Sequence, residues 1–211
     1  MEPERVVHVA AGRLPRWIDG FAGRHGAVEA TLTSDEVALQ APDGARAVVA
    51  VPFLPWTPAG EPVDALLAHV GRERQVGAVL VRKGGYAVGR FAGPRLLASK
   101  VDSTYVQGRT KAGGWSQQRF ARRRANQSTK AYAEAAEVTT RLLAPYAGEL
   151  EALVGGGDKA AVAAVLGDPR LTALRPLLQP RVHPVPDPRL RVLEAFPAQF
   201  LGVEIGLNPL A

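Results

Sequence analysis

Apolar and polar positions follow two periods along this 211-residue chain, and each period predicts a different kind of element. Short apolar or alternating runs bounded by turn residues predict strands. Apolar residues three and four positions apart predict helices. The predicted extended segments are residues 6–10, 27–33, 37–40, 46–51, 76–82, 86–91, 95–106, 150–154, 182–185 and 202–207. The predicted helices are residues 14–23, 62–74, 117–144, 159–166, 170–178 and 188–200.

The order of these elements predicts an α+β fold with a mixed β-sheet, flanking helices and one long helix. Three consecutive strands between residues 76 and 106 predict a meander, and the alternation of strands and helices after residue 145 adds partly parallel pairing. We predict an N-terminal β/α portion of unassigned role over residues 1–75 and a second portion over 76–211. One continuous domain over 1–211 is the alternative.

The longest predicted helix, roughly 28 residues and about 42 Å long, carries two separate stripes. At 100° per residue, one stripe is polar and cationic and the other is apolar. The first contains Arg119, Arg122, Arg123, Asn126 and Lys130, and the second contains Phe120, Ala131, Ala135, Val138 and Leu142. Arg124 lies in the apolar sector, so the amino-terminal end is expected to extend beyond the body of the domain.

Charge concentrates in the same part of the chain. No acidic residue lies between Ser103 and Ala133, and seven basic residues do. The chain has 26 basic and 20 acidic residues, so without these seven it has 19 basic residues against 20 acidic ones. Solvated helix faces usually mix the two signs, whereas a row of guanidinium groups matches nucleic-acid phosphates. Membrane-surface binding is the rival interpretation, but the opposite face is rich in alanine and poor in large apolar residues. We therefore predict nucleic-acid contact.

Several classes of site are excluded or disfavoured by composition. The chain has no cysteine, which removes disulfides, thiol nucleophiles and thiolate metal sites. The four histidines, His8, His25, His69 and His183, are not at metal-ligand or catalytic spacing, so we expect no metal and no cofactor. The amino terminus does not resemble a secretory signal, and no apolar run reaches the ~18 residues of a membrane span. These features predict a cytoplasmic protein that makes no membrane contact.

Directly before the cationic stripe stands Gly113-Gly114-Trp115-Ser116-Gln117. The glycine pair allows positive φ angles and a close approach to a partner, and the glutamine amide both donates and accepts hydrogen bonds without carrying charge. Such a group can orient a water molecule. The alternative is an ordinary turn in which Ser116 caps the following helix. A second glycine run, Gly155-Gly156-Gly157, is either a phosphate cradle or a plain strand-to-helix turn.

The stretch from Thr110 to Phe120, followed by three arginines at 122–124, resembles the active loop and following helix of the Vms-like release factors. These are peptidyl-tRNA hydrolases related to the middle domain of eukaryotic and archaeal class-one peptide-release factors. The family's Gly-x-x-Gln pattern matches Gly114, Trp115, Ser116 and Gln117. The resemblance is sharpest over residues 100 to 145, and the lack of zinc-finger cysteines and ankyrin-like repeats is similar to the reduced, actinobacterial type.

The resemblance implies a release-factor-like catalytic domain over residues 76–211 and a function in ribosome-associated quality control. The loop would enter the large ribosomal subunit, and Gln117 would place water against the ester of peptidyl-tRNA. Gly113, Gly114 and Ser116 would complete the catalytic site, with the two glycines giving the loop its conformation. The resemblance implies rRNA contacts for Arg109, Lys111, Trp115, Arg119, Arg122, Arg123, Arg124 and Lys130. A non-catalytic RNA-binding adaptor and a tRNA nuclease are the alternative functions.

Overall fold

The chain divides into two compact units. The computed structural model describes residues 4–83, 85–102 and 115–211, with 115–128 described as helical backbone. Unit 1 comprises Met1–Glu73 and Pro197–Ala211, and unit 2 comprises Arg74–Phe196. We predicted that residues 197–211 belong to the second portion, but they form part of unit 1. Their strand, Gly202–Leu207, pairs with the strands Arg5–Ala10 and Arg46–Ala50 of that unit.

Unit 1 is built on a five-stranded antiparallel sheet with the strand order β1-β10-β4-β3-β2. Its strands are β1 (Arg5–Ala10), β2 (Glu29–Leu32), β3 (Glu36–Gln40), β4 (Arg46–Ala50) and β10 (Gly202–Leu207). The turn between β3 and β4 contains Gly44 at φ 90°, and the side chain of Asp43 accepts a hydrogen bond from the Ala45 amide, as the Pro-Asp-Gly sequence predicted.

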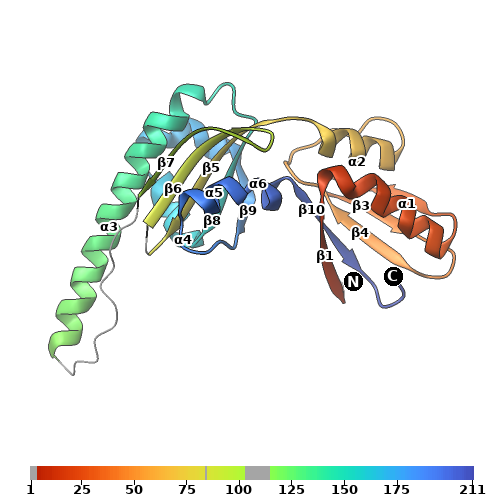
Figure 1. Ribbon diagram of the computed structural model, residues 1–211, viewed down its shortest axis with the longest axis horizontal. Coiled ribbons are helices and arrows are strands. Elements are labelled where there is room, and N and C mark those ends of the chain that lie inside the picture. Colours follow the sequence, from red (N-terminus) through yellow and green to blue (C-terminus); the bar gives the residue numbers. More distant parts are fainter. Residues whose placement is uncertain (1–3, 84, 103–114) are drawn as a thin grey trace. The chain divides into compact units, whose positions relative to one another are not determined.

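One face of this sheet carries the core of unit 1. Alternate strand residues such as Val37, Leu39 and Ile205 are fully buried. They pack with α1 (Leu14–His25) and α2 (Pro62–Gly71), which supply Phe21 and Leu66. Short helical segments η1 (Ala11–Arg13) and α6 (Pro197–Phe200) complete the unit (Figure 1).

Unit 2 has a mixed sheet with the strand order β7-β6-β5-β8-β9. β5 (Gln75–Arg82), β6 (Gly85–Ala92) and β7 (Arg95–Asp102) form the predicted antiparallel meander. β8 (Ala152–Gly157) pairs in parallel with β5, and β9 (Leu178–His183) pairs in parallel with β8. The predicted α+β class with a mixed sheet is therefore confirmed.

Helices cover both faces of this second sheet, which explains why β5 and β6 are almost continuously buried. One face packs against α3 (Trp115–Leu143), η2 (Ala144–Tyr146), α4 (Lys159–Leu166) and η3 (Pro169–Leu177). The other face packs against α5 (Leu190–Ala195), where a β-carbon on Gly89 would lie 3.1 Å from Leu193.

Two predicted elements differ in the structure for identifiable reasons. The helix expected over 188–200 is split into α5 and α6, because Pro197 has no amide hydrogen with which to continue α5. The turn expected at Gly155–Gly157 is instead the end of β8, which remains paired with β5 up to Gly157.

Candidate functional site

Helix α3 is anchored to unit 2 through its carboxyl-terminal half. Ala135 and Val138 pack in the core formed with the sheet and neighbouring helices, and the buried Ala131 lies on the same helix face at i, i+4, i+7 spacing. The fully buried hydroxyl of Thr139 donates a 2.7 Å hydrogen bond to the carbonyl of Ala135, so this polar group is satisfied inside the helix. The predicted apolar stripe therefore holds the helix in place.

A cation–π contact fixes the chain just after the helix. The guanidinium carbon of Arg90 in β6 lies 3.7 Å from the centre of the Tyr146 ring in η2. Arg90 Nε is buried without a hydrogen-bond partner among the described residues, so the ring face compensates part of its charge. Sequence reasoning missed this pair, although a lone arginine in an apolar strand was an available signal.

The direction of α3 follows from strand register. β7 ends at Asp102 opposite Tyr86, at the edge of the sheet where β5 also ends. After α3, the chain enters β8 at Ala152, which pairs with Val76 at the opposite edge. Helix α3 therefore begins on the side of the sheet where β5, β7, β8 and β9 have their carboxyl ends.

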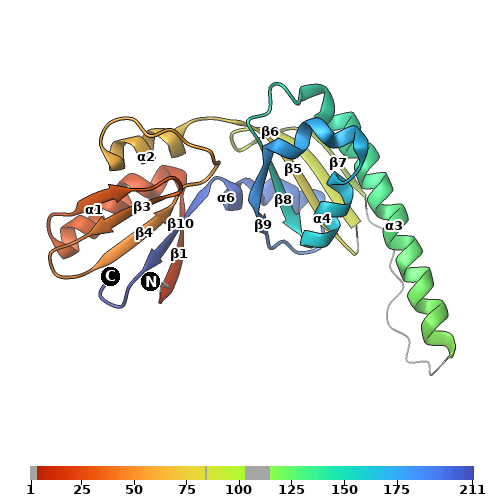
Figure 2. The ribbon, with the colours of Figure 1, turned by 180° about the vertical axis from the view of Figure 1, so that it is seen from behind.

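The amino-terminal turns of α3 extend past that edge. The helix has 29 residues, about 43 Å at 1.5 Å per residue, whereas an eight-residue strand spans about 27 Å. Figures 1 and 2 both show these turns beyond the sheet. Trp115, Ser116 and Gln117 form the first turn, so the structure starts the helix two residues before the predicted position.

The remaining predicted site residues divide into two groups. The cationic residues Arg119, Arg122, Arg123 and Arg124 all lie in the amino-terminal half of α3, and Lys130 lies near its middle. Arg109, Lys111, Gly113 and Gly114 fall outside the described residues. Lys130 Nζ lies 3.9 Å from a carboxylate oxygen of Glu134, the first acidic residue after the acid-free window. The roles of all these residues remain predictions.

Each histidine has a local neighbour that accounts for it. His8 Nε2 lies 3.2 Å from Glu204, and His69 Nε2 lies 2.8 Å from the carbonyl oxygen of Pro52. His25 lies 2.8 Å from Asp43, whose pKa is lowered first by the Ala45 amide and then by this histidine. His183 is buried with its ring edge-on to Phe196. Throughout the described ranges, no three His, Asp or Glu side chains gather as metal ligands would.

The glycine run before α4 has a structural explanation. Asp158 caps the helix by accepting hydrogen bonds from the amides of Ala160 and Ala161, at 2.9 and 3.3 Å. These are the amides that a phosphate would use. The adjoining hollow, about 480 Å³, is lined by two cations and two carboxylates, and Arg82 Nη1 already donates to the carbonyl of Val185. The arrangement argues against a phosphate cradle, since Gly155–Gly157 end strand β8 and Asp158 caps α4 directly after them.

Comparison with known protein families identifies the family of the unit that contains the long helix α3. The family described as actinobacteria/chloroflexi VLRF1 release factor matches residues 74–206. The chain belongs to this family. The match begins at the first residue of unit 2 and includes the whole of α3, so the resemblance seen in the sequence is confirmed. Membership in a release-factor family indicates a translation-related function.

Solved structures from archaea give more distant similarities. The archaeal translation termination factor aRF1 is 16% identical, with a TM-score of 0.42, over 92% of this chain and 64% of that one. A second structure, titled "Archaeal protein", is 17% identical, with a TM-score of 0.41, over 95% of this chain and 65% of that one. The chain therefore spans less than two thirds of either. No curated protein matches the sequence.

No helix in the described part of the chain is both long enough and apolar enough to span a membrane.

Proposed function

We propose that this protein is a ribosome-dependent peptidyl-tRNA hydrolase that releases nascent chains from stalled large subunits. The observation that carries the proposal is the release-factor family match over residues 74–206, which includes the Gly114-Trp115-Ser116-Gln117 sequence. Such a protein acts in the cytoplasm, with rRNA and peptidyl-tRNA as its partners and no cofactor or metal of its own.

Ester hydrolysis needs an oriented water molecule and stabilisation of the charge that develops on the carbonyl oxygen. In our proposal, the Gln117 amide positions the water, while Gly113 and Gly114 allow the loop to approach the ester and Ser116 lies beside Gln117 in the first turn of α3. Ribosomal RNA supplies the surrounding polar groups. This division of roles is consistent with the sequence of the loop and the start of the helix, because no His, Asp or Glu lies between Ser103 and Ala133.

The anchoring of α3 supports this assignment. Its buried carboxyl-terminal half fixes the helix to unit 2, while its amino-terminal turns extend past the sheet edge. A glutamine at the first turn of such a helix can enter a cavity in a large partner. The arginines at 119 and 122–124 then lie behind it, where they bind phosphates along the path of entry, together with Arg109, Lys111 and Lys130, and Trp115 stacks on a base.

The test uses two neighbouring glutamines. We expect Gln117→Ala to reduce peptide release from stalled large-subunit complexes roughly 100-fold, the cost of losing one positioned group, with binding nearly unchanged. Gln118→Ala is the matched control, because it removes the same amide one residue further along α3. Release is measured by the appearance of free tRNA and binding by co-sedimentation. Undiminished release by Gln117→Ala contradicts a catalytic role for this residue.

The same assay separates the alternative functions. A non-catalytic adaptor binds the complexes and releases nothing even as the wild-type protein. A tRNA nuclease leaves a shortened tRNA 3′ end on a sequencing gel, whereas ester hydrolysis leaves that end whole. The acid-free window argues against a nuclease, since metal-dependent nucleases need nearby carboxylates.

A further inference from the structure

The sheet of unit 1 has one covered face and one open face. Helices α1 and α2 pack on the face that carries Val37, Leu39 and Ile205. Because strand side chains alternate, the residues between them point to the opposite face. In the described residues of unit 1, no helix covers that face, and Val6 there is 50% exposed.

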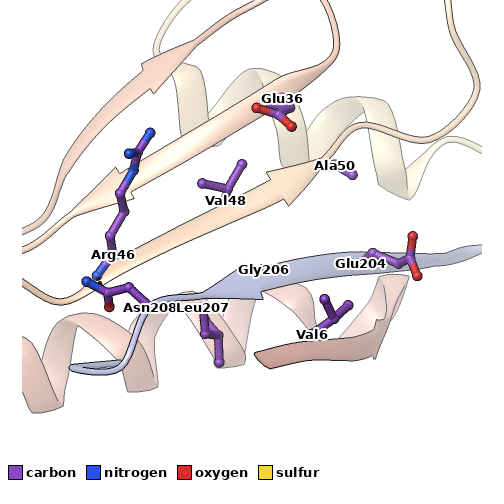
Figure 3. Close-up of a pocket in the computed structure, with 9 residues that line it drawn as sticks. All are labelled: Val6, Glu36, Arg46, Val48, Ala50, Glu204, Gly206, Leu207 and Asn208. Atoms are coloured by element: carbon purple, nitrogen blue, oxygen red, sulfur yellow. Dashed lines mark hydrogen bonds between the residues drawn. The ribbon is translucent and has the colours of Figure 1, made fainter. Parts of the chain in front are cut away.

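Cross-strand register places four apolar or small residues in one row across the open face. Ala38 pairs with Val48, Val48 pairs with Gly206, and Gly206 pairs with Val6. We call these four residues the apolar row. Gly206 has no side chain, and Val6, Val48 and Gly206 of the row line a shallow hollow of about 360 Å³ (Figure 3).

A second row beside it is acidic. Glu36 of β3 pairs with Ala50 of β4. On the other side of β4, Val49 pairs with Ile205 of β10, so the antiparallel register places Glu204 next to Ala50. Glu204 also contacts His8 at 3.2 Å. On the other side of the apolar row, Arg46 pairs with Gln40. Figure 3 shows Glu36 and Glu204 at one end of the hollow and Arg46 at the other.

The charge of this face is opposite to that of the chain as a whole. Its described strand residues contribute the carboxylates of Glu29, Glu36 and Glu204 against the single guanidinium of Arg46. The whole chain has a formal charge of +6. RNA phosphates are repelled by such a face, whereas a cationic polypeptide is attracted.

We propose that the open face of unit 1 docks an amphipathic basic helix of a partner protein. The apolar row crosses four strands about 4.8 Å apart, so it is about 14 Å long, enough for roughly three helical turns. Rows two residues apart are separated by about 6.8 Å. A helix about 10 Å wide that lies along the apolar row therefore reaches the rows on both sides of it. Its cationic side contacts Glu36 and Glu204, and a polar or acidic side contacts Arg46. The small contact area makes this a weak, micromolar interaction.

The inference stands apart from the hydrolytic function, because it concerns the unit that does not carry the loop. It is tested with the full chain and a synthetic helical peptide of leucine and lysine that has one apolar face. Two further peptides serve as controls: one with glutamate in place of lysine, and one of the same basic composition without an apolar face. Binding is located and quantified by ¹⁵N–¹H NMR titration.

We expect the basic amphipathic peptide to shift amide signals of β3, β4 and β10, and the two control peptides to bind there at least tenfold more weakly. Glu36→Lys should weaken binding roughly three- to tenfold, since it replaces attraction by repulsion at the surface. Asp19→Lys makes the same charge change on exposed α1, over the other face of the sheet, and should have no effect.

A third variant separates docking from general attraction. Val48→Asp makes the face more acidic but interrupts the apolar row, so docking predicts weaker binding and non-specific attraction predicts stronger binding. Val48→Thr, which keeps the side-chain shape, replaces it if the aspartate variant does not fold. Shifts confined to unit 2, or equal binding by Glu36→Lys and Asp19→Lys, would overturn the proposal. So would signals at β4 that shift with protein concentration alone, because a second copy would then be the occupant.

Discussion

Gly157, the last residue of β8, offers a sharp test of how the glycine run before α4 functions. Its φ angle is 97°, which side-chain-bearing residues rarely adopt, and a β-carbon there would overlap with the carbonyl oxygen of Val81 in β5. That same oxygen accepts a 2.8 Å hydrogen bond from the Asp158 amide. Because the obstacle is backbone, it cannot be relieved by moving a side chain.

The cost of Gly157→Ala can be estimated from these contacts. The left-handed backbone costs about 1–2 kcal/mol for alanine. Separating β5 from β8 to admit the methyl group costs about 1–3 kcal/mol of packing, with about 1 kcal/mol more for the hydrogen bond to Val81. We expect unit 2 to lose about 3–6 kcal/mol, a large share of the stability of an ordinary domain.

Hydrogen exchange measured by mass spectrometry is the appropriate assay, because it resolves the two units. Trp17 and Trp56 both lie in unit 1, so tryptophan fluorescence would report largely on the wrong part of the chain. Amides of β5 and β8 should exchange roughly 100- to 1,000-fold faster in Gly157→Ala, or unit 2 should lose its protection altogether. Peptides from β3 and β4 serve as the internal reference.

Two other glycines calibrate the result. A β-carbon on Gly148 meets nothing within 4 Å, so Gly148→Ala should be neutral or slightly stabilising. Gly155→Ala places its methyl group 3.1 Å from Val162, which predicts an intermediate loss of about 1 kcal/mol. If β5 and β8 in Gly157→Ala exchange within threefold of the wild-type rate, the steric explanation is wrong.

Two further predictions concern charge. Asp168 accepts hydrogen bonds from the Arg170 side chain and amide, which lower its pKa from the usual 3.8 to about 2. The ionised Asp168 therefore stabilises unit 2 fully above pH 3.8, and this stabilisation is lost as the pH falls towards about 2. Asp168→Asn, which keeps the helix cap, should flatten the acid-induced decrease in unit 2 stability over this interval, as measured by hydrogen exchange. Replacing Arg122 and Arg123 together by Ala should weaken ribosome binding and reduce the slope of log K against log salt by about 2 if each contacts one phosphate, as measured by co-sedimentation at several salt concentrations.

Much of the fold was predictable because each element has a clear local pattern. The apolar runs and turn residues of the sequence predict the meander from Gln75 to Asp102 and the hairpin around Asp43-Gly44, and the structure contains both. The long helix was also predictable, since Ala131, Ala135 and Val138 lie on one face at helical spacing.

What the sequence did not predict depends on contacts between distant residues. Nothing local in 202–207 indicates that this strand inserts between β1 and β4, because pairing partners are selected by the whole sheet. Similarly, Gly155–Gly157 has the composition of a turn, but parallel pairing with β5 extends the strand. The open face of unit 1 became visible only when register aligned Ala38, Val48, Gly206 and Val6.

For the candidate site, the sequence supplied the family and the cationic stripe, and the structure added the direction and anchoring of α3. The resemblance rested on Gly114 to Gln117 and on the arginines that follow. This motif lies within a short stretch of the chain, so it can be recognised from the sequence alone. The contact of Arg90 with Tyr146 joins residues 56 positions apart, beyond the reach of any periodicity.

The position of β10 has a consequence for the order in which the chain acquires its structure during synthesis. β10 is the neighbour of β1 in the sheet and separates it from β4, yet it is made after every element of unit 2. Until β10 has been translated, β1 therefore lacks its neighbouring strand. The sheet of unit 1 stays incomplete during that time, although β2, β3 and β4 have already been made. The inserted unit can fold from a continuous stretch as soon as it emerges, so the part made first becomes complete last.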